Sequence, residues 1–61
     1  MHRRWVFELV KMNADQIKKS RDQGQADDVI ADAILSAMGS TRGYRHNMAR
    51  KKLLIALSEF H

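Results

Sequence analysis

The residues best suited to chemistry in this sequence are the cations between Ser40 and Lys52. This segment contains arginines, lysines and a histidine, but no aspartate or glutamate. Backbone N–H groups at a helix start, a glycine and flanking arginines together suit a bound anion. Arginine and asparagine side chains also hydrogen bond to guanine and adenine edges in a major groove. We predict a nucleic-acid-binding site formed by Arg42, Arg45, His46, Asn47, Arg50, Lys51 and Lys52.

This segment fits a helix-turn-helix motif only loosely. At 100° per residue, Arg45 and Lys52 lie on one side of a helix. Arg50 and Lys51 point to other sides. Ser40 and Arg45 also occupy positions where that motif has apolar residues, if Gly39 is its turn glycine. Cations late in a helix are favoured by the helix dipole alone. Nucleic acid and an acidic protein surface therefore both stay open as partners.

Catalysis is not expected from the nucleophilic side chains. A nucleophilic hydroxyl needs a base within hydrogen-bond reach and a third group that orients the base. Ser36, Ser40 and Thr41 have only His46 as a histidine nearby in the sequence. We therefore predict that the protein is not an enzyme and has no small-molecule substrate.

Metal and cofactor binding are not expected either. The chain has no cysteine, and its three histidines, His2, His46 and His61, are dispersed. Asp28 and Asp32 lie one helical turn apart, but the simpler interpretation is the wet edge of a mostly buried helix. No phosphate-binding glycine loop or dinucleotide fingerprint is present. The sequence predicts no metal and no cofactor.

The elements that must position these residues are helices. The chain has no proline, and Gly24 and Gly39 stand where helices are expected to end. Ser40 or Thr41 is expected to cap the last helix. We predict a single all-α domain, 1–61, built as a small bundle of three helices over about 3–23, 26–38 and 44–60. The pattern leaves open whether the first of these is one continuous helix or two pieces around Asn13.

Apolar residues cover more of these helices than a lone bundle can bury. In the 26–38 segment, Asp28, Asp32 and Ser36 fall in one narrow arc, and almost all other positions are apolar. A chain of 61 residues buries only about 60% of its surface, and this one has no cysteine for a disulfide. We therefore expect homodimerisation, or a higher assembly, to complete the bundle.

The first and last helices are predicted to carry different faces. Opposite charges four apart in the first helix predict a self-neutralising wet face, at Arg4–Glu8, Lys11–Asp15 and Lys18–Asp22. The last helix has a main apolar stripe at Ala49, Leu53, Ala56, Leu57 and Phe60. A second apolar stripe lies nearly opposite on the same helix, and another surface is needed to cover it. We predict a partner or dimer interface at Trp5, Phe7, Tyr44, Met48, Leu54 and Ile55.

Two functions of different classes follow from these features. The first is a small, dimeric, non-catalytic regulatory protein whose basic turn and start of the last helix contact nucleic acid. The second is a helical adaptor or stoichiometric inhibitor, of the kind that phages and plasmids encode, which docks an apolar helix face on a larger protein. A purely structural assembly unit is a third. Without a secretory core or a membrane span, the chain is expected to be soluble and cytoplasmic.

Overall fold

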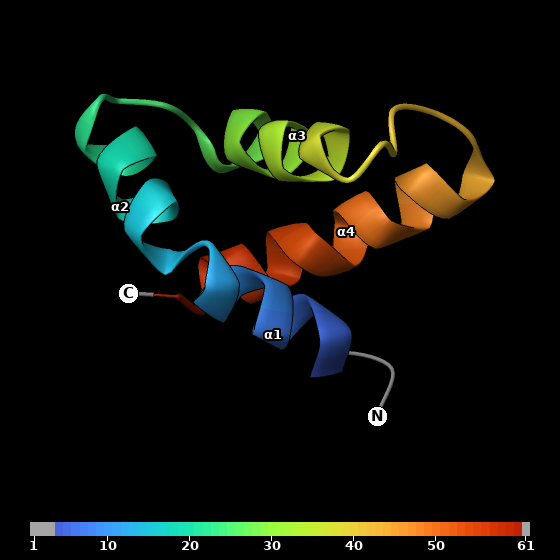
Figure 1. Cartoon of the computed structure of the whole chain (residues 1–61), viewed down its shortest axis with the longest axis horizontal. Coiled ribbons are helices and arrows are strands. Elements are labelled where there is room, and N and C mark those ends of the chain that lie inside the picture. Colours follow the sequence, from blue (N-terminus) through green and yellow to red (C-terminus); the bar gives the residue numbers. More distant parts are fainter. Residues whose placement is uncertain (1–3, 61) are drawn as a thin grey trace.

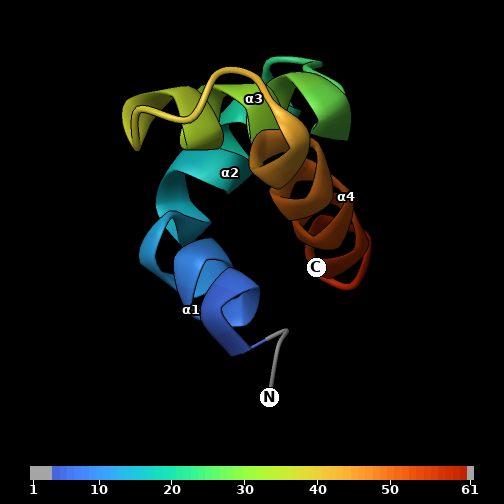
Figure 2. The same ribbon diagram turned by 90° about the vertical axis from the view of Figure 1, so that its right-hand side faces the viewer.

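The computed structural model describes residues 4–60, which fold into four helices. They are α1 (Arg4–Met12), α2 (Ala14–Asp22), α3 (Asp27–Ala37) and α4 (Tyr44–Ser58). Figure 1 shows α3 and α4 running in roughly opposite directions, with α1 on the other side of α4 and α2 linking α1 to α3. After a 90° turn, α3 lies across the top with α1 and α4 below it (Figure 2). The all-helical prediction is confirmed, whereas the predicted number of helices is wrong.

The predicted first helix is two helices separated at Asn13. The backbone of this residue has φ −107° and ψ 15°, and its Nδ2 donates a hydrogen bond to the carbonyl of Leu9 at 2.8 Å. A short polar side chain that binds nearby backbone competes with the helical hydrogen bonds. The resulting bend lets α1 lie along α4 while α2 turns towards α3 (Figure 1). The described residues do not include Arg3, where the first helix is predicted to start, or His2 and His61.

Two helices end at the predicted glycines. Gly24 and Gly39 have φ of 82° and 83°, a left-handed conformation that costs glycine little. Beyond Gly39, the N–H of Ser40 donates back to the carbonyl of Leu35 at 2.9 Å, which closes the end of α3. The chain thus ends α2 and α3 where the sequence predicts, to within one or two residues.

The predicted cap of α4 is wrong. The residue before the helix is Gly43, with φ 103° and ψ 174°, and no side chain caps the first turn. The backbone in this region is open almost only to glycine. The helix therefore starts two residues later than a cap at Thr41 requires, and three residues later than a cap at Ser40 requires. The Ser40 hydroxyl instead meets His46.

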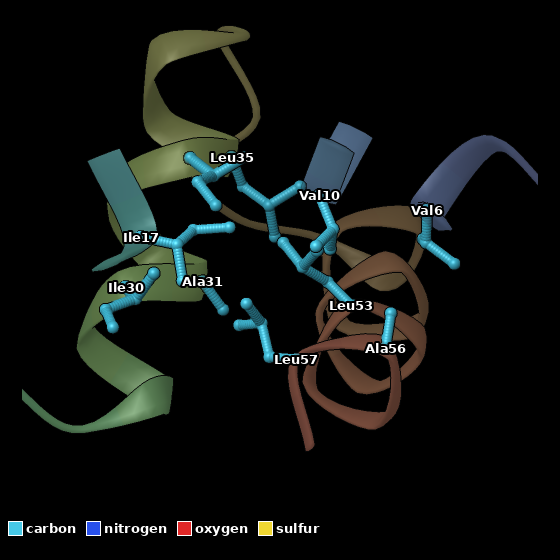
Figure 3. Close-up of a cluster of buried hydrophobic side chains, with 10 residues drawn as sticks. Val6, Val10, Ile17, Ile30, Ala31, Leu35, Leu53, Ala56 and Leu57 are labelled. Carbon is cyan, nitrogen blue, oxygen red and sulfur yellow. The ribbon is translucent and has the colours of Figure 1, made fainter. Parts of the chain in front are cut away.

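The core lies between α4 and the other three helices (Figure 3). On α4, the buried members Leu53, Ala56 and Leu57 confirm the predicted main stripe, and Ala49 and Phe60 pack against the core. Burying one such leucine contributes roughly 1.5–3 kcal/mol. The ten buried apolar residues within the described part of the chain are Val6, Val10, Ile17, Ile30, Ala31, Ile34, Leu35, Leu53, Ala56 and Leu57.

The charged face of α1 and α2 does not form the predicted ion pairs. These side chains are exposed, where the small gain from an ion pair is offset by side-chain entropy. The break at Asn13 also removes the helical spacing across it. Both ion pairs within residues 4–60 lie elsewhere, and none joins Arg4 to Glu8, Lys11 to Asp15 or Lys18 to Asp22.

Candidate nucleic-acid interface

The predicted basic segment lies at one end of the molecule. It comprises the loop after α3 and the first half of α4, at the right of Figure 1, whereas α2 lies at the left. The longest extent of the chain is 30 Å. The hairpin of α3 and α4 therefore carries the basic segment well away from the exposed lysines of α2.

The exposed cations here are Arg42, Arg45 and Lys51. None of them forms an ion pair within residues 4–60. Asn47 is also exposed, and Lys52 is half-buried on the same side of α4 as Arg45. The structure thus leaves most of the predicted set accessible, but spread over two sides of the helix.

Arg50 is held by an acid of α3. Its Nε donates to Oδ1 of Asp32 at 2.7 Å across the outer seam between α3 and α4. This hydrogen bond lowers the pKa of Asp32 and raises the pKa of Arg50. The two residues are 18 apart in the sequence, so periodicity within one helix gives no sign of the pair.

His46 joins the loop to the first turns of α4. Its Nδ1 lies 3.1 Å from Oγ of Ser40, and both residues are half-buried. A serine and a histidine at this distance resemble a nucleophile and its base. However, no third side chain within residues 4–60 hydrogen bonds to His46. The contact therefore supports the loop shape, and with it the placement of Arg42 and Arg45.

The predicted interface residues divide into three groups. Tyr44, Met48 and Ile55 lie exposed on the side of α4 opposite its buried stripe, and Tyr44 is 79% exposed. Trp5 and Phe7 are about two-fifths exposed, at 40% and 38%, on either side of buried Val6. The remaining residue, Leu54, packs partly buried against the core.

Sequence reasoning missed Arg21, which joins three helices. Its guanidinium donates to the carbonyls of Leu57 and Phe60 at 2.6 Å each. Leu57 lies in the last turn of α4, and Phe60 lies just beyond the helix. It also bonds to the carboxylate of Asp27 at 3.2 and 3.3 Å and lies 5.7 Å from the centre of the Phe60 ring. Most of these partners are more than thirty residues away in sequence, so no local pattern predicts the contact.

Other kinds of site are not seen in the part of the chain that the structure describes. The surface of residues 4–60 has no pocket, and no three acidic or histidine side chains there are grouped for a metal ion. None of the described helices has the length and apolar character needed to cross a membrane. The chain matches no protein-family model, no curated protein and no solved structure.

Proposed function

We propose that this protein is a small, dimeric, non-catalytic regulator that contacts nucleic acid through the α3–α4 loop and the start of α4. One observation carries the proposal. In a stretch without any acid, Arg42, Arg45 and Lys51 are exposed and form no ion pair within residues 4–60. Cations that do not stabilise the fold by pairing remain available for phosphates.

The proposed contacts differ along the segment. Arg42, Arg45 and Asn47 are closest to the bases, since their side chains can read base edges. Lys51 and Lys52 contact backbone phosphates. Each phosphate that is neutralised adds about 0.9 to the slope of log affinity against log salt for duplex DNA. Arg50 contributes less, because Asp32 already holds its guanidinium.

The first experiment measures retention of labelled duplex DNA and RNA by the purified chain. We expect binding at about 50 mM salt that weakens steeply by about 200 mM. Absence of binding to either duplex at the lower salt concentration would contradict the proposal.

Matched double variants locate the contact. Replacing Arg42 and Arg45 by alanine should weaken binding to duplex, by about 1–3 kcal/mol for each base contact that is lost. Replacing the exposed Lys18 and Lys19 by alanine removes the same charge from α2, at the opposite end of the molecule (Figure 1). This control should bind like the parent chain. Equal losses in the two variants would mean that only net charge matters.

A second function is favoured by a different observation. Tyr44, Met48 and Ile55 expose apolar surface on one face of α4, which suits an adaptor or inhibitor that docks on a larger protein. An acidic rim on that protein would match the neighbouring cations. A partner recovered in a fixed ratio, resistant to nuclease and lost with Ile55→Glu, would support this function over the first.

A further inference from the structure

Ser40 and His46 form a hydrogen-bonded pair inside the basic segment. Oγ of Ser40 lies 3.1 Å from Nδ1 of His46, and both residues are half-buried. Within residues 4–60, no buried side-chain nitrogen or oxygen lacks a hydrogen-bond partner. The second ring nitrogen of His46, Nε2, has no partner among these residues, so it reaches the solvent. The pair therefore presents a titratable nitrogen at the surface of the segment.

Protonation of the ring changes what this pair can donate. A neutral histidine carries a proton on one ring nitrogen, whereas the imidazolium ion carries a proton on both. If the neutral ring is protonated at Nε2, the Ser40 hydroxyl donates to Nδ1 and only Nε2–H is free. If it is protonated at Nδ1, that nitrogen donates to Ser40 Oγ and only the hydroxyl proton is free. In the imidazolium form, Nδ1–H donates to Ser40, and both other protons are free. Uptake of one proton thus adds one free donor and one positive charge in either case.

The charged groups around His46 have both signs. On α3, the hydrogen bond from Arg50 is the largest cause that lowers the pKa of Asp32, and the charge of His46 adds a smaller lowering. Arg45 adjoins His46 on α4, Arg50 follows one turn later, and the loop contributes Arg42. The other charged residues of the two helices that pack on α4 form no ion pair with it: Arg4, Glu8 and Lys11 of α1, and Asp27 and Asp28 of α3. A bound phosphate adds only negative charge, which favours the protonated ring.

We infer that His46 couples nucleic-acid binding to the uptake of a proton, with Ser40 as its hydrogen-bonded partner. The protonated pair donates from Nε2 and from the Ser40 hydroxyl to oxygens of the phosphate backbone. Histidine is the side chain whose charge ordinarily changes between pH 5 and 8, so affinity rises as the pH falls through this range. The inference rests on the proposed function and adds a regulation of the same site.

The other cations of the segment do not give this response. Lysine and arginine side chains ordinarily stay charged below about pH 10, and aspartates ordinarily titrate near 4. His2 and His61 are the other two histidines of the sequence, so they provide the matched control.

Retention of labelled duplex DNA and RNA at about 50 mM salt, measured at about pH 5.5 and about pH 7.5, tests the inference. We expect binding about tenfold tighter at the lower pH, the gain that one added charge-assisted hydrogen bond gives. His46→Gln keeps a polar side chain that cannot be protonated, so its affinity should be the same at both values. The double variant His2→Gln with His61→Gln should keep the full response. Ser40→Ala keeps the ring charge but loses one donor, so its response should be smaller.

Nuclear magnetic resonance of the His46 ring gives a readout on the unaltered chain. The pH midpoint of its ring-proton shifts should move to higher pH when duplex is added, because coupling between proton and ligand is reciprocal. A midpoint that duplex does not move overturns the inference, even if His46→Gln fails to fold. Helical circular dichroism at both pH values checks the folding of each variant.

Failure of the coupling is distinct from failure of the proposed function. Retention of neither duplex at either pH contradicts both. Retention by the parent chain that is equal at the two pH values overturns the coupling and leaves the nucleic-acid contact standing. The same holds if His46→Gln responds to pH as strongly as the parent. A response lost in the control variant assigns it to another histidine and also overturns the coupling.

Discussion

The two ends of this molecule use arginine in opposite ways. At the end formed by α2, the start of α3 and the last turn of α4, Arg21 meets a carboxylate and two backbone carbonyls. We call this the clamped end. At the end formed by the α3–α4 loop and the start of α4, Arg42 and Arg45 meet no acid within residues 4–60. We call this the open end.

The difference comes from what the fold brings to each arginine. At the clamped end, the C-terminus of α4 lies near the N-terminus of α3. The guanidinium of Arg21 therefore faces both the negative end of α4 and the aspartate that begins α3. The open end contains a loop and a helix start in a segment without acids. Arg21 at the clamped end stabilises the fold, and Arg42 and Arg45 at the open end are available to a partner.

The strongest test of this comparison is Arg21→Ala. Hydrogen bonds from a charged group contribute about 1.5–3 kcal/mol each, and this group is partly exposed, so we expect a loss of about 2–4 kcal/mol in the free energy of unfolding. Urea denaturation, monitored by circular dichroism, measures this loss of stability. Arg21→Lys keeps the charge but not the forked geometry, and should recover only part of the loss. Arg45→Ala should change stability by less than about 0.5 kcal/mol. Similar losses for Arg21→Ala and Arg45→Ala would remove the distinction between the ends.

The second test strains the open end through its backbone. Gly43→Ala forces alanine into a conformation with φ 103° and ψ 174°, yet an added Cβ would have no heavy atom within 4 Å. The cost is therefore backbone strain alone, on the order of 1–3 kcal/mol. Gly24→Asn places a residue that tolerates the left-handed region at φ 82°, and should cost less. Thermal unfolding compares the two variants.

Gly43→Ala should also affect the binding of nucleic acid. Displacement of the loop moves Arg42 relative to Arg45, so affinity for duplex should fall in Gly43→Ala and stay unchanged in Gly24→Asn. Unchanged affinity in both variants would show that the loop shape is irrelevant to the contact.

The smallest effect concerns the ion pair between the two helices of the hairpin. Because the hydrogen bond from Arg50 lowers the pKa of Asp32 in the folded chain, the pair stabilises the fold above the unfolded pKa of about 4. That contribution is lost as the pH falls through the lowered folded value. Asp32 is exposed and Arg50 is partly exposed, so the change should be slight and reduced by salt. Asp32→Asn should show a weaker dependence of stability on pH below about 4 than the parent chain.

The same substitution should increase nucleic-acid affinity. Asp32→Asn releases Arg50 and removes an acid beside the basic segment, so the salt slope should rise by about one. Ser36→Ala, on the same helix but uncharged, is the control. A slope that does not rise would show that Arg50 lies outside the contact.

Much of the fold could be predicted from local patterns. Gly24 and Gly39 end helices because left-handed backbone strongly favours glycine. The stripe through Leu53 and Leu57 is buried because helical periodicity places these residues together. The break at Asn13 could not be predicted in this way, since asparagine is tolerated inside many helices and a neighbour decides whether it bends the chain.

Burial on α1 could not be predicted in the same way. Trp5, Phe7 and Met12 have the same apolar character as Val6 and Val10, yet only the two valines are buried. A helix can turn only one side to the core, and which side it turns depends on the helix it meets. The exposure of the large side chains therefore follows from packing on α4.

The sequence by itself determined that the chain is helical, roughly where its helices end, and that one stretch carries cations without acids. These properties depend on residues within a few positions of each other, whose backbone preferences and spacing are local. Only the tertiary structure decided that Arg50 is paired, that Arg21 closes three helices, and that Arg42 and Arg45 are left exposed. Each of these depends on which distant backbone or carboxylate comes within about 3 Å, and that distance is set by helix packing rather than by neighbours along the chain.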